Sequence, residues 1–214
     1  MNDVPQPTPG DVIVRAVIGL LESGGYDAVQ LREVARRAHV SLATIYKLFP
    51  TRDELIVTAI AQWMAQNCYG ELALPAPDET LHDGLMRIFR YVFEPWERNP
   101  RMLEAHHRAR AAPGGHRLDL LGMDAVEPVA RAVLAGGDPD YVRDIELILT
   151  NMVYAVIGKF AEGKLGSTAI LPALERDVHR ITTNNEPAAA LARTRRAGGE
   201  PAARSSVPAR RASR

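Results

Sequence analysis

The 214-residue sequence has little that would tie it to a membrane, a disulfide scaffold or a broadly basic surface. It contains one cysteine, Cys68, which excludes an internal disulfide framework. No apolar run is long enough to cross a bilayer. The 26 Lys and Arg are balanced by 26 Asp and Glu, which excludes a domain-wide basic field and leaves local patches open. The remaining composition, 46% hydrophobic and 24% charged, is that of an ordinary globular protein.

The two ends of the sequence differ from the rest. Residues 1–10, MNDVPQPTPG, lack the basic-then-apolar order of a signal peptide, so we expect a flexible lead-in and a cytoplasmic protein. Residues 184–214 carry seven Arg against two Glu and almost no large apolar side chain. Such a segment buries too little surface to offset its ordering entropy, and we expect an Arg-rich disordered tail. A solubilising role is favoured for this tail, and a contact with DNA stays open.

Elsewhere apolar residues recur at helical spacing, and we see neither a strand-like alternation nor an internal repeat. Val14, Ile18 and Leu21 mark a helix over 12–23, which the pair Gly24-Gly25 ends. Pro95 is expected to kink or end one of the later helices. The fold class is therefore all-α, with further helices at 30–37, 41–48, from 51 onward, 80–98, 101–112, 124–135, 140–163 and 171–183.

The segments 30–37 and 41–48 form the most informative pattern. Both are short and amphipathic, and a three-residue turn separates them. Ser41 stands where an N-cap belongs, and Thr51 with Glu54 fits a capping box for the following helix. This is typical of a helix-turn-helix, whose second helix lies in the major groove of DNA. The alternative is a helical hairpin in which Tyr46 and Lys47 only cover the edge of a core.

The second helix of this motif has the side chains that a groove-reading helix needs. Small residues allow a close approach to base edges, hydroxyls bind phosphates or bases, and an apolar side chain contacts thymine methyl groups. Arg52 is placed for a flanking phosphate. The candidate DNA-contacting residues are Gln30, Ser41, Leu42, Ala43, Thr44, Tyr46, Lys47 and Arg52.

Residues 12–66 resemble the N-terminal domain of TetR-family transcriptional regulators. The resemblance rests on the Gly-Tyr pair after the first helix, the Arg-Glu-Val-Ala run, Val-Ser before the recognition helix, Ile-Tyr-Lys-Leu-Phe and the Thr-Arg cap. It implies a homodimer that binds a palindromic operator in double-stranded DNA, and we expect this regulator to be a repressor. It also implies a C-terminal domain that binds a small effector, which moves the two DNA-binding heads apart and weakens binding.

Four positions depart from the family pattern. His39 replaces the usual glycine of the turn, Ala43 replaces another common glycine, and Val29 stands where a capping Thr is common. The lead-in before Val12 has no Arg or Lys, although many members have a basic arm there. Base specificity is therefore expected to depend mainly on residues 42–47.

The break at 72–79, LALPAPDE, separates a helix-turn-helix domain at 11–70, with its motif at about 30–49, from a helical effector-binding and dimerisation domain at 78–183. This second domain is rich in aromatic and Met side chains. They suit an apolar pocket between helices, although ordinary core packing is the simpler interpretation for any one of them. The candidate pocket residues are Met86, Phe89, Phe93, Trp96, Met102, Met123 and Tyr154.

The segment 145–160, IELILTNMVYAVIGKF, is apolar nearly all round, so we expect it to be buried on two sides, by the core and by a second copy. In the TetR family the last two long helices form the dimer, here about 140–163 and 171–183. Two stretches, GGYDAVQLREVA and RNPRMLEAHHRA, are also similar to the actinobacterial repressors of cholesterol and steroid catabolism. That similarity implies a bulky hydrophobic effector, lipid-like or steroid-like, and leaves open that it binds as a CoA thioester.

The sequence has no phosphate loop, nucleophile elbow or metal-ligand spacing, so we expect no enzyme, metal or cofactor. The adjacent His106 and His107 point about 100° apart on a helix, and solvated or locally bonded histidines are the preferred interpretation. The alternative to a DNA-binding regulator is a helical protein that binds a hydrophobic ligand and has no specific DNA function.

Overall fold

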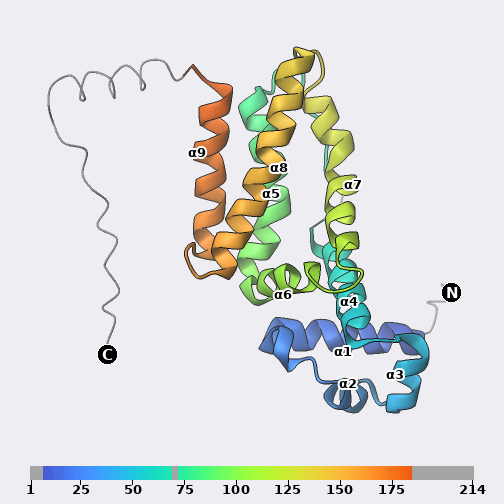
Figure 1. Ribbon diagram of the computed structural model, residues 1–214. Coiled ribbons are helices and arrows are strands. Elements are labelled where there is room, and N and C mark those ends of the chain that lie inside the picture. Colours follow the sequence, from blue (N-terminus) through green and yellow to red (C-terminus); the bar gives the residue numbers. More distant parts are fainter. Residues whose placement is uncertain (1–6, 69–71, 185–214) are drawn as a thin grey trace, which may run out of the picture.

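The computed structural model describes residues 7–68 and 72–184, and every regular element in these ranges is helical (Figure 1). The all-α prediction is therefore confirmed. The predicted arginine-rich tail, apart from residue 184, and residues 1–6 of the predicted lead-in lie outside the described residues. The elements are α1 Pro9–Gly24, η1 Tyr26–Ala28, α2 Leu31–Ala38, α3 Leu42–Leu48, α4 Arg52–Asn67, α5 Leu81–Arg98, α6 Pro100–Arg110, α7 His116–Val133, α8 Pro139–Ala161, η2 Ser167–Ala169 and α9 Ile170–Thr182.

Helices α1 to α3 form the lower part of the molecule in Figure 1, which we call the head, and α4 leads from it into the larger bundle. In that bundle α9 packs against both α5 and α8, α7 packs against α5, and α6 lies across the lower end of these helices, next to the head. Helix α6 packs against α1, η1 and α4 on the head side and against α5, α7 and α8 on the bundle side. It is therefore the layer between the two parts.

The first helix begins earlier than its apolar pattern predicts. Thr8 caps it with a reciprocal pair of bonds: Thr8 Oγ1 accepts from the Asp11 N–H at 3.2 Å, and the Thr8 N–H donates to Asp11 Oδ2 at 2.9 Å. Pro at the first helical position removes a donor that has no partner there. Pro9 and Gly10 thus belong to the helix and not to a flexible lead-in. The end of α1 is as predicted, since Gly25 has φ 73°.

The turn of the motif follows the sequence prediction closely. Helix α2 ends where His39 takes the left-handed conformation, φ 53° and ψ 40°, which glycine usually occupies in such a turn. Ser41 then caps α3. Val34 and Ile45 are fully buried between the two helices. The packing that makes a helix-turn-helix rigid is therefore present, with the strain of one non-glycine residue in its turn.

Helix α5 agrees with the prediction of 80–98, Pro95 does not end it, and one later boundary, the start of α7, differs from the prediction. Helix α5 continues through Pro95 to Arg98, and packing of the buried Pro95 and Trp96 side chains compensates for the hydrogen bond that proline cannot donate. Helix α7 begins at His116, eight residues before the expected start at 124. Its early turns were missed because Gly122 resembles an interruption, although Leu118 is fully buried.

One continuous core joins the head to the bundle. Trp63 of α4 is 1% exposed, and its ring centroid lies 4.6 Å from that of Trp96 on α5. Its Nε1–H donates to Glu22 Oε1 on α1 at 3.0 Å. Cys68, at the end of α4, is buried, and burial raises the pKa of its thiol to about 12. None of the described helices combines the length and apolarity that spanning a membrane requires.

Candidate DNA-binding surface and internal cavity

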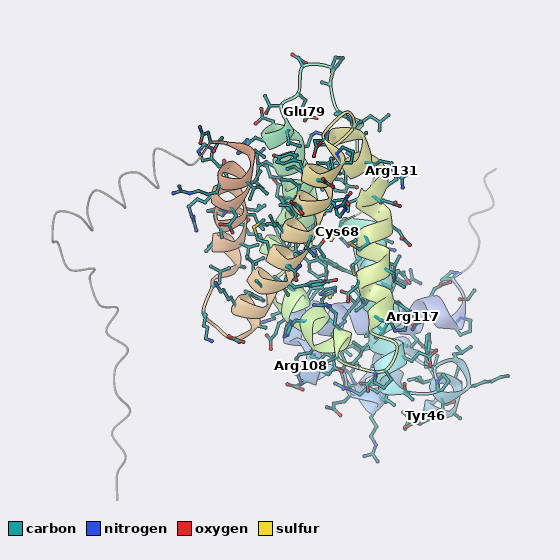
Figure 2. All side chains as sticks on the ribbon, turned by 45° about the horizontal axis from the view of Figure 1, so that its top comes forward. Tyr46, Cys68, Glu79, Arg108, Arg117 and Arg131 are labelled. Carbon is teal, nitrogen blue, oxygen red and sulfur yellow. The ribbon has the colours of Figure 1, made fainter. Side chains whose placement is uncertain are left out.

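Helix α3 presents its outer face at the end of the head, as the position of Tyr46 in Figure 2 shows. Ser41 Oγ accepts from the Thr44 N–H at 3.0 Å and lies 2.9 Å from Thr44 Oγ1. Ile45 faces the core, whereas Tyr46 is 55% exposed and Lys47 is exposed beside it. Six of the predicted DNA-contacting residues, those at 41–44, 46 and 47, therefore lie together on this short helix and its cap, and the outer face of the helix is exposed.

The electrostatics of the head come mainly from α2. Glu33 forms ion pairs with Arg36 at 2.7 Å and Arg37 at 2.8 Å, and these bonds lower the pKa of Glu33 to about 2. Arg32 is exposed on the same helix. Three arginines against one carboxylate make α2 a local basic surface next to α3, which the overall charge balance conceals. Gln30, at the start of α2, is exposed and donates through Nε2 to the Asp27 carbonyl at 3.0 Å.

Arg52 is not arranged as the sequence predicts. Its Nε and Nη2 donate to the carbonyl oxygens of Val29 and Tyr26, both at 2.7 Å, and its guanidinium stacks on the Tyr26 ring at 4.7 Å. The side chain therefore attaches the start of α4 to the loop before α2. The structure gives it a bracing role, and a phosphate contact by Arg52 stays a prediction that these bonds do not favour.

This bracing role predicts a loss of stability. Arg52→Gln removes two charged donors from half-buried carbonyls, and we expect the free energy of unfolding to fall by about 1–2 kcal/mol. Urea unfolding measures it, with Arg32→Gln as the exposed control. Unchanged stability combined with weaker DNA binding would instead support a phosphate contact.

A cavity of about 580 Å³ lies in the bundle between α5, α6, α7 and α8. Its wall is mainly apolar and includes Phe89, Phe93, Trp96, Met123 and Tyr154, five of the predicted pocket residues. Met86 and Met102 do not line it. They are 1% and 0% exposed and pack in the core, just outside the faces that α5 and α6 turn to the cavity.

The cavity also has polar residues that the sequence interpretation missed. His106, Arg110 and Asp119 line it where α6 meets α7. His106 is 6% exposed and its Nδ1 is buried without a hydrogen-bond partner among the described residues, so the solvated interpretation is wrong for this histidine. Burial, followed by the neighbouring Arg110 charge, lowers its pKa to about 3, which makes the ring neutral near pH 7. In the sequence, His106 stands four positions before Arg110, which places both on one face of a helix. This spacing was the signal from which a polar part of the cavity wall could have been predicted.

The opposite face of α6 is attached to the head. Arg108 donates to both carboxylate oxygens of Asp27, at 2.7 and 2.8 Å, and its guanidinium lies 4.3 Å from the centre of the Tyr26 ring. Tyr26 is thus contacted by both Arg108 and Arg52. One eleven-residue helix therefore touches the cavity with one face and the loop that precedes α2 with the other.

The outer face of α8 and α9 is apolar and open in the single chain. Leu147 is 64% exposed and Ile148 is 45% exposed. Together with Met152 and Ala155 they line a shallow groove that Ile181 of α9 completes. The other side of α8 is buried through Ile145, Val156 and Ile157, so the helix has one covered side and one uncovered side, and its burial by a second copy stays a prediction. No group of three metal-binding side chains occurs in the described part of the chain.

Two family models match this chain. The model of bacterial regulatory proteins of the tetR family matches residues 13–59, and the tetracyclin repressor-like C-terminal domain matches residues 79–181. The chain belongs to the TetR family. The TetR family is one of regulators, which agrees with the expectation that the protein is not an enzyme.

Similar TetR-family relatives include two repressors. The HTH-type transcriptional repressor KstR of Mycolicibacterium smegmatis is 31% identical over 134 residues, which cover 59% of this chain and 63% of KstR. KstR of Rhodococcus jostii is 32% identical over 97 residues, 45% of each protein. The predicted similarity to this branch of the TetR family is confirmed. The matched segments span less than two thirds of the length of these relatives.

Solved structures support the TetR fold. A crystal structure of a TetR transcriptional regulator from Rhodococcus sp. RHA1 has a TM-score of 0.60 at 18% identity, covering 82% of this chain and 96% of that one. A TetR-like regulator from the same source has a TM-score of 0.55 at 16% identity, covering 83% and 97%. At sequence identities this low, the similarity to these two structures shows the fold alone.

Proposed function

We propose that this chain is a homodimeric transcriptional regulator, a repressor that a small hydrophobic effector releases from a palindromic operator in double-stranded DNA. It acts in the cytoplasm, at the nucleoid. The observation that carries the proposal is the capped, outward-facing α3 beside the basic surface of α2. Residues 41–47 enter the major groove, and the α2 arginines contact flanking phosphates. The KstR relatives, which are named as repressors, support repression over activation.

The cavity and α6 support the regulatory part of the proposal. An effector that fits the cavity contacts Trp96, His106 and Tyr154, and α6 connects this wall to Asp27 and Tyr26 in the head. A ligand can change the operator affinity only if it binds more tightly to one spacing of the two heads than to another. The size of the change is limited by that difference in binding free energy. We infer that the bound effector favours a spacing that does not fit both half-sites. A lipid-like or steroid-like molecule suits the apolar wall.

The experiment that tests this function isolates the genomic fragments that the purified protein retains. The variant Tyr46→Ala/Lys47→Ala is expected to lose specific retention, with operator affinity falling at least 100-fold, because both side chains are exposed on α3 and carry its phenolic hydroxyl and its positive charge. Gel shifts at several salt concentrations measure the loss.

The matched control is Leu74→Ala/Lys164→Ala, which removes an exposed apolar side chain and an exposed lysine outside the head. It should bind like the unchanged protein. Equal retention by the α3 variant would contradict the proposal and favour a ligand-binding protein without a specific DNA function.

A further inference from the structure

The charges on the cavity wall restrict what can bind there. Four carboxylates line it against two guanidinium groups. Arg131 is paired with Glu127, and Arg110 is paired with Asp119. The other two carboxylates, Asp124 and Glu146, have no third arginine or lysine among the lining residues. With His106 neutral, the lining residues have a formal charge of −2, and because Asp124 and Glu146 are exposed to solvent, this charge disfavours an anion at the opening of the cavity.

Arg110 is not free to receive a carboxylate or phosphate. Its Nη2 donates to Asp119 Oδ2 at 3.0 Å, and its Nε lies 2.5 Å from Asp119 Oδ1, close but poorly aligned for a hydrogen bond. The guanidinium also lies 4.5 Å from the centre of the Tyr154 ring. An acidic ligand would have to displace Asp119 from this pair and leave that carboxylate in a half-buried position, which is unfavourable.

The cavity is long. Its lining residues on α7 extend from Leu118 to Arg131, thirteen steps that span about 20 Å at the rise of an α-helix. Figure 2 shows Arg131 and Arg117 at opposite ends of α7. A sphere of about 580 Å³ would be only about 10 Å across, so the space is a slot along α7.

His106 supplies an unused polar group at the α6 end of this slot. A neutral imidazole has one donor and one acceptor nitrogen, and a buried polar atom without a partner is unfavourable. The Nδ1 of His106 lacks such a partner among the described residues. The ring lines the cavity, and its other nitrogen, Nε2, is not among the buried atoms without a partner, so Nε2 is the nitrogen that a ligand can reach. A ligand oxygen at this end of the slot therefore gains a bond that the empty protein lacks.

We propose that the effector is an elongated, uncharged and mainly apolar molecule with a hydroxyl or carbonyl oxygen at one end, and that this oxygen hydrogen-bonds to His106. The inference rests on the proposed function only in calling this ligand the effector. It sharpens the lipid-like or steroid-like expectation by excluding fatty acid anions and other acidic amphiphiles. His106 is here a specificity residue, and its neighbour Arg110 keeps its partner Asp119 when the ligand is bound.

The test compares two probes of the same steroid skeleton, the methyl ester of 4-androsten-3-one-17β-carboxylic acid and the free acid. They differ in charge and by one methyl group, and the methyl group alone accounts for only about a fourfold difference in affinity. Binding to the full-length protein without DNA is followed by the fluorescence of its two tryptophans, since Trp96 lines the cavity, and by calorimetry. The neutral ester is expected to bind at least tenfold more tightly than the anion. Asp124→Asn/Glu146→Gln should reduce this preference by making the wall less negative.

The role of His106 is tested by His106→Phe, which is expected to weaken binding of the ester at least tenfold. His106→Gln, which retains a donor and an acceptor, should recover part of the loss. His116→Phe is the control, because His116 is exposed and does not line the cavity. Thermal unfolding of each variant shows whether its fold is retained, and the Gln variant decides the matter if the Phe variant does not fold.

Three results would overturn the proposal: no binding of the ester up to its solubility limit, equal or tighter binding of the acid, or unchanged binding by the folded His106 variants. None of these measurements uses DNA. Failure of the proposed regulatory function would appear only in the operator experiment, so the two failures are distinguishable.

Discussion

Replacing Leu147 and Ile148 together by glutamate is expected to convert the proposed homodimer into monomers and to lower operator affinity at least 100-fold. These two side chains are the most exposed aliphatic groups of α8, and they line the apolar groove that α9 completes. Two carboxylates buried there without partners would oppose association. A monomer also loses the second half-site, whose binding inside a dimer is intramolecular and increases affinity by about 10²–10⁴.

Sedimentation and operator gel shifts measure both effects. Leu120→Glu is the control, because Leu120 is 56% exposed on α7 and does not line the groove. It should stay dimeric and bind DNA normally. A double variant that stays dimeric would place the dimer interface elsewhere on the molecule.

Trp63→Ala is expected to have the largest effect on stability, a loss of about 3–5 kcal/mol in the free energy of unfolding and a Tm lower by about 6–20 °C. Trp63 is almost fully buried, packs on Trp96 and donates to Glu22. Its removal leaves a cavity where α1, α4 and α5 meet. Trp63→Phe should cost less, because it keeps most of the apolar volume and loses mainly the hydrogen bond.

Urea unfolding followed by circular dichroism measures the free energies, and the fluorescence of the remaining Trp96 reports on the bundle. Because one core joins head and bundle, both signals should change in a single transition. Separate transitions, or a loss below about 1 kcal/mol, would show that the head and the bundle are stabilised independently.

Local signals account for what the sequence predicted well. Ser41 as an N-cap, Gly25 at positive φ and the buried pair Val34 and Ile45 follow from the chemistry of neighbouring residues, so they can be identified without the fold. The same holds for most helices of the bundle, whose apolar periodicity is strong. The resemblance of residues 12–66 to the TetR family then supplied the larger architecture, which periodicity alone does not.

What the sequence did not predict depends on contacts between distant segments. Arg52 bonds to carbonyls more than twenty positions away, and only the fold shows that its donors are used. His106 is buried against Trp96 of α5, whose ring centroid lies 5.1 Å from its own, and no spacing rule distinguishes it from its half-buried neighbour His107. Met86 has the right chemistry for the cavity but lies just beyond its edge, an angular difference too small for helical periodicity to resolve.

The burial of Cys68 has a practical consequence for measuring regulation. It is the single cysteine of the sequence, and a thiol with a pKa of about 12 forms almost no reactive thiolate at neutral pH. A cysteine introduced at an exposed position of α2, such as Arg36→Cys, would therefore be modified selectively in the otherwise unchanged protein. Spin labels or dyes attached there in both protomers of a dimer would report the distance between the two heads directly, with and without an effector.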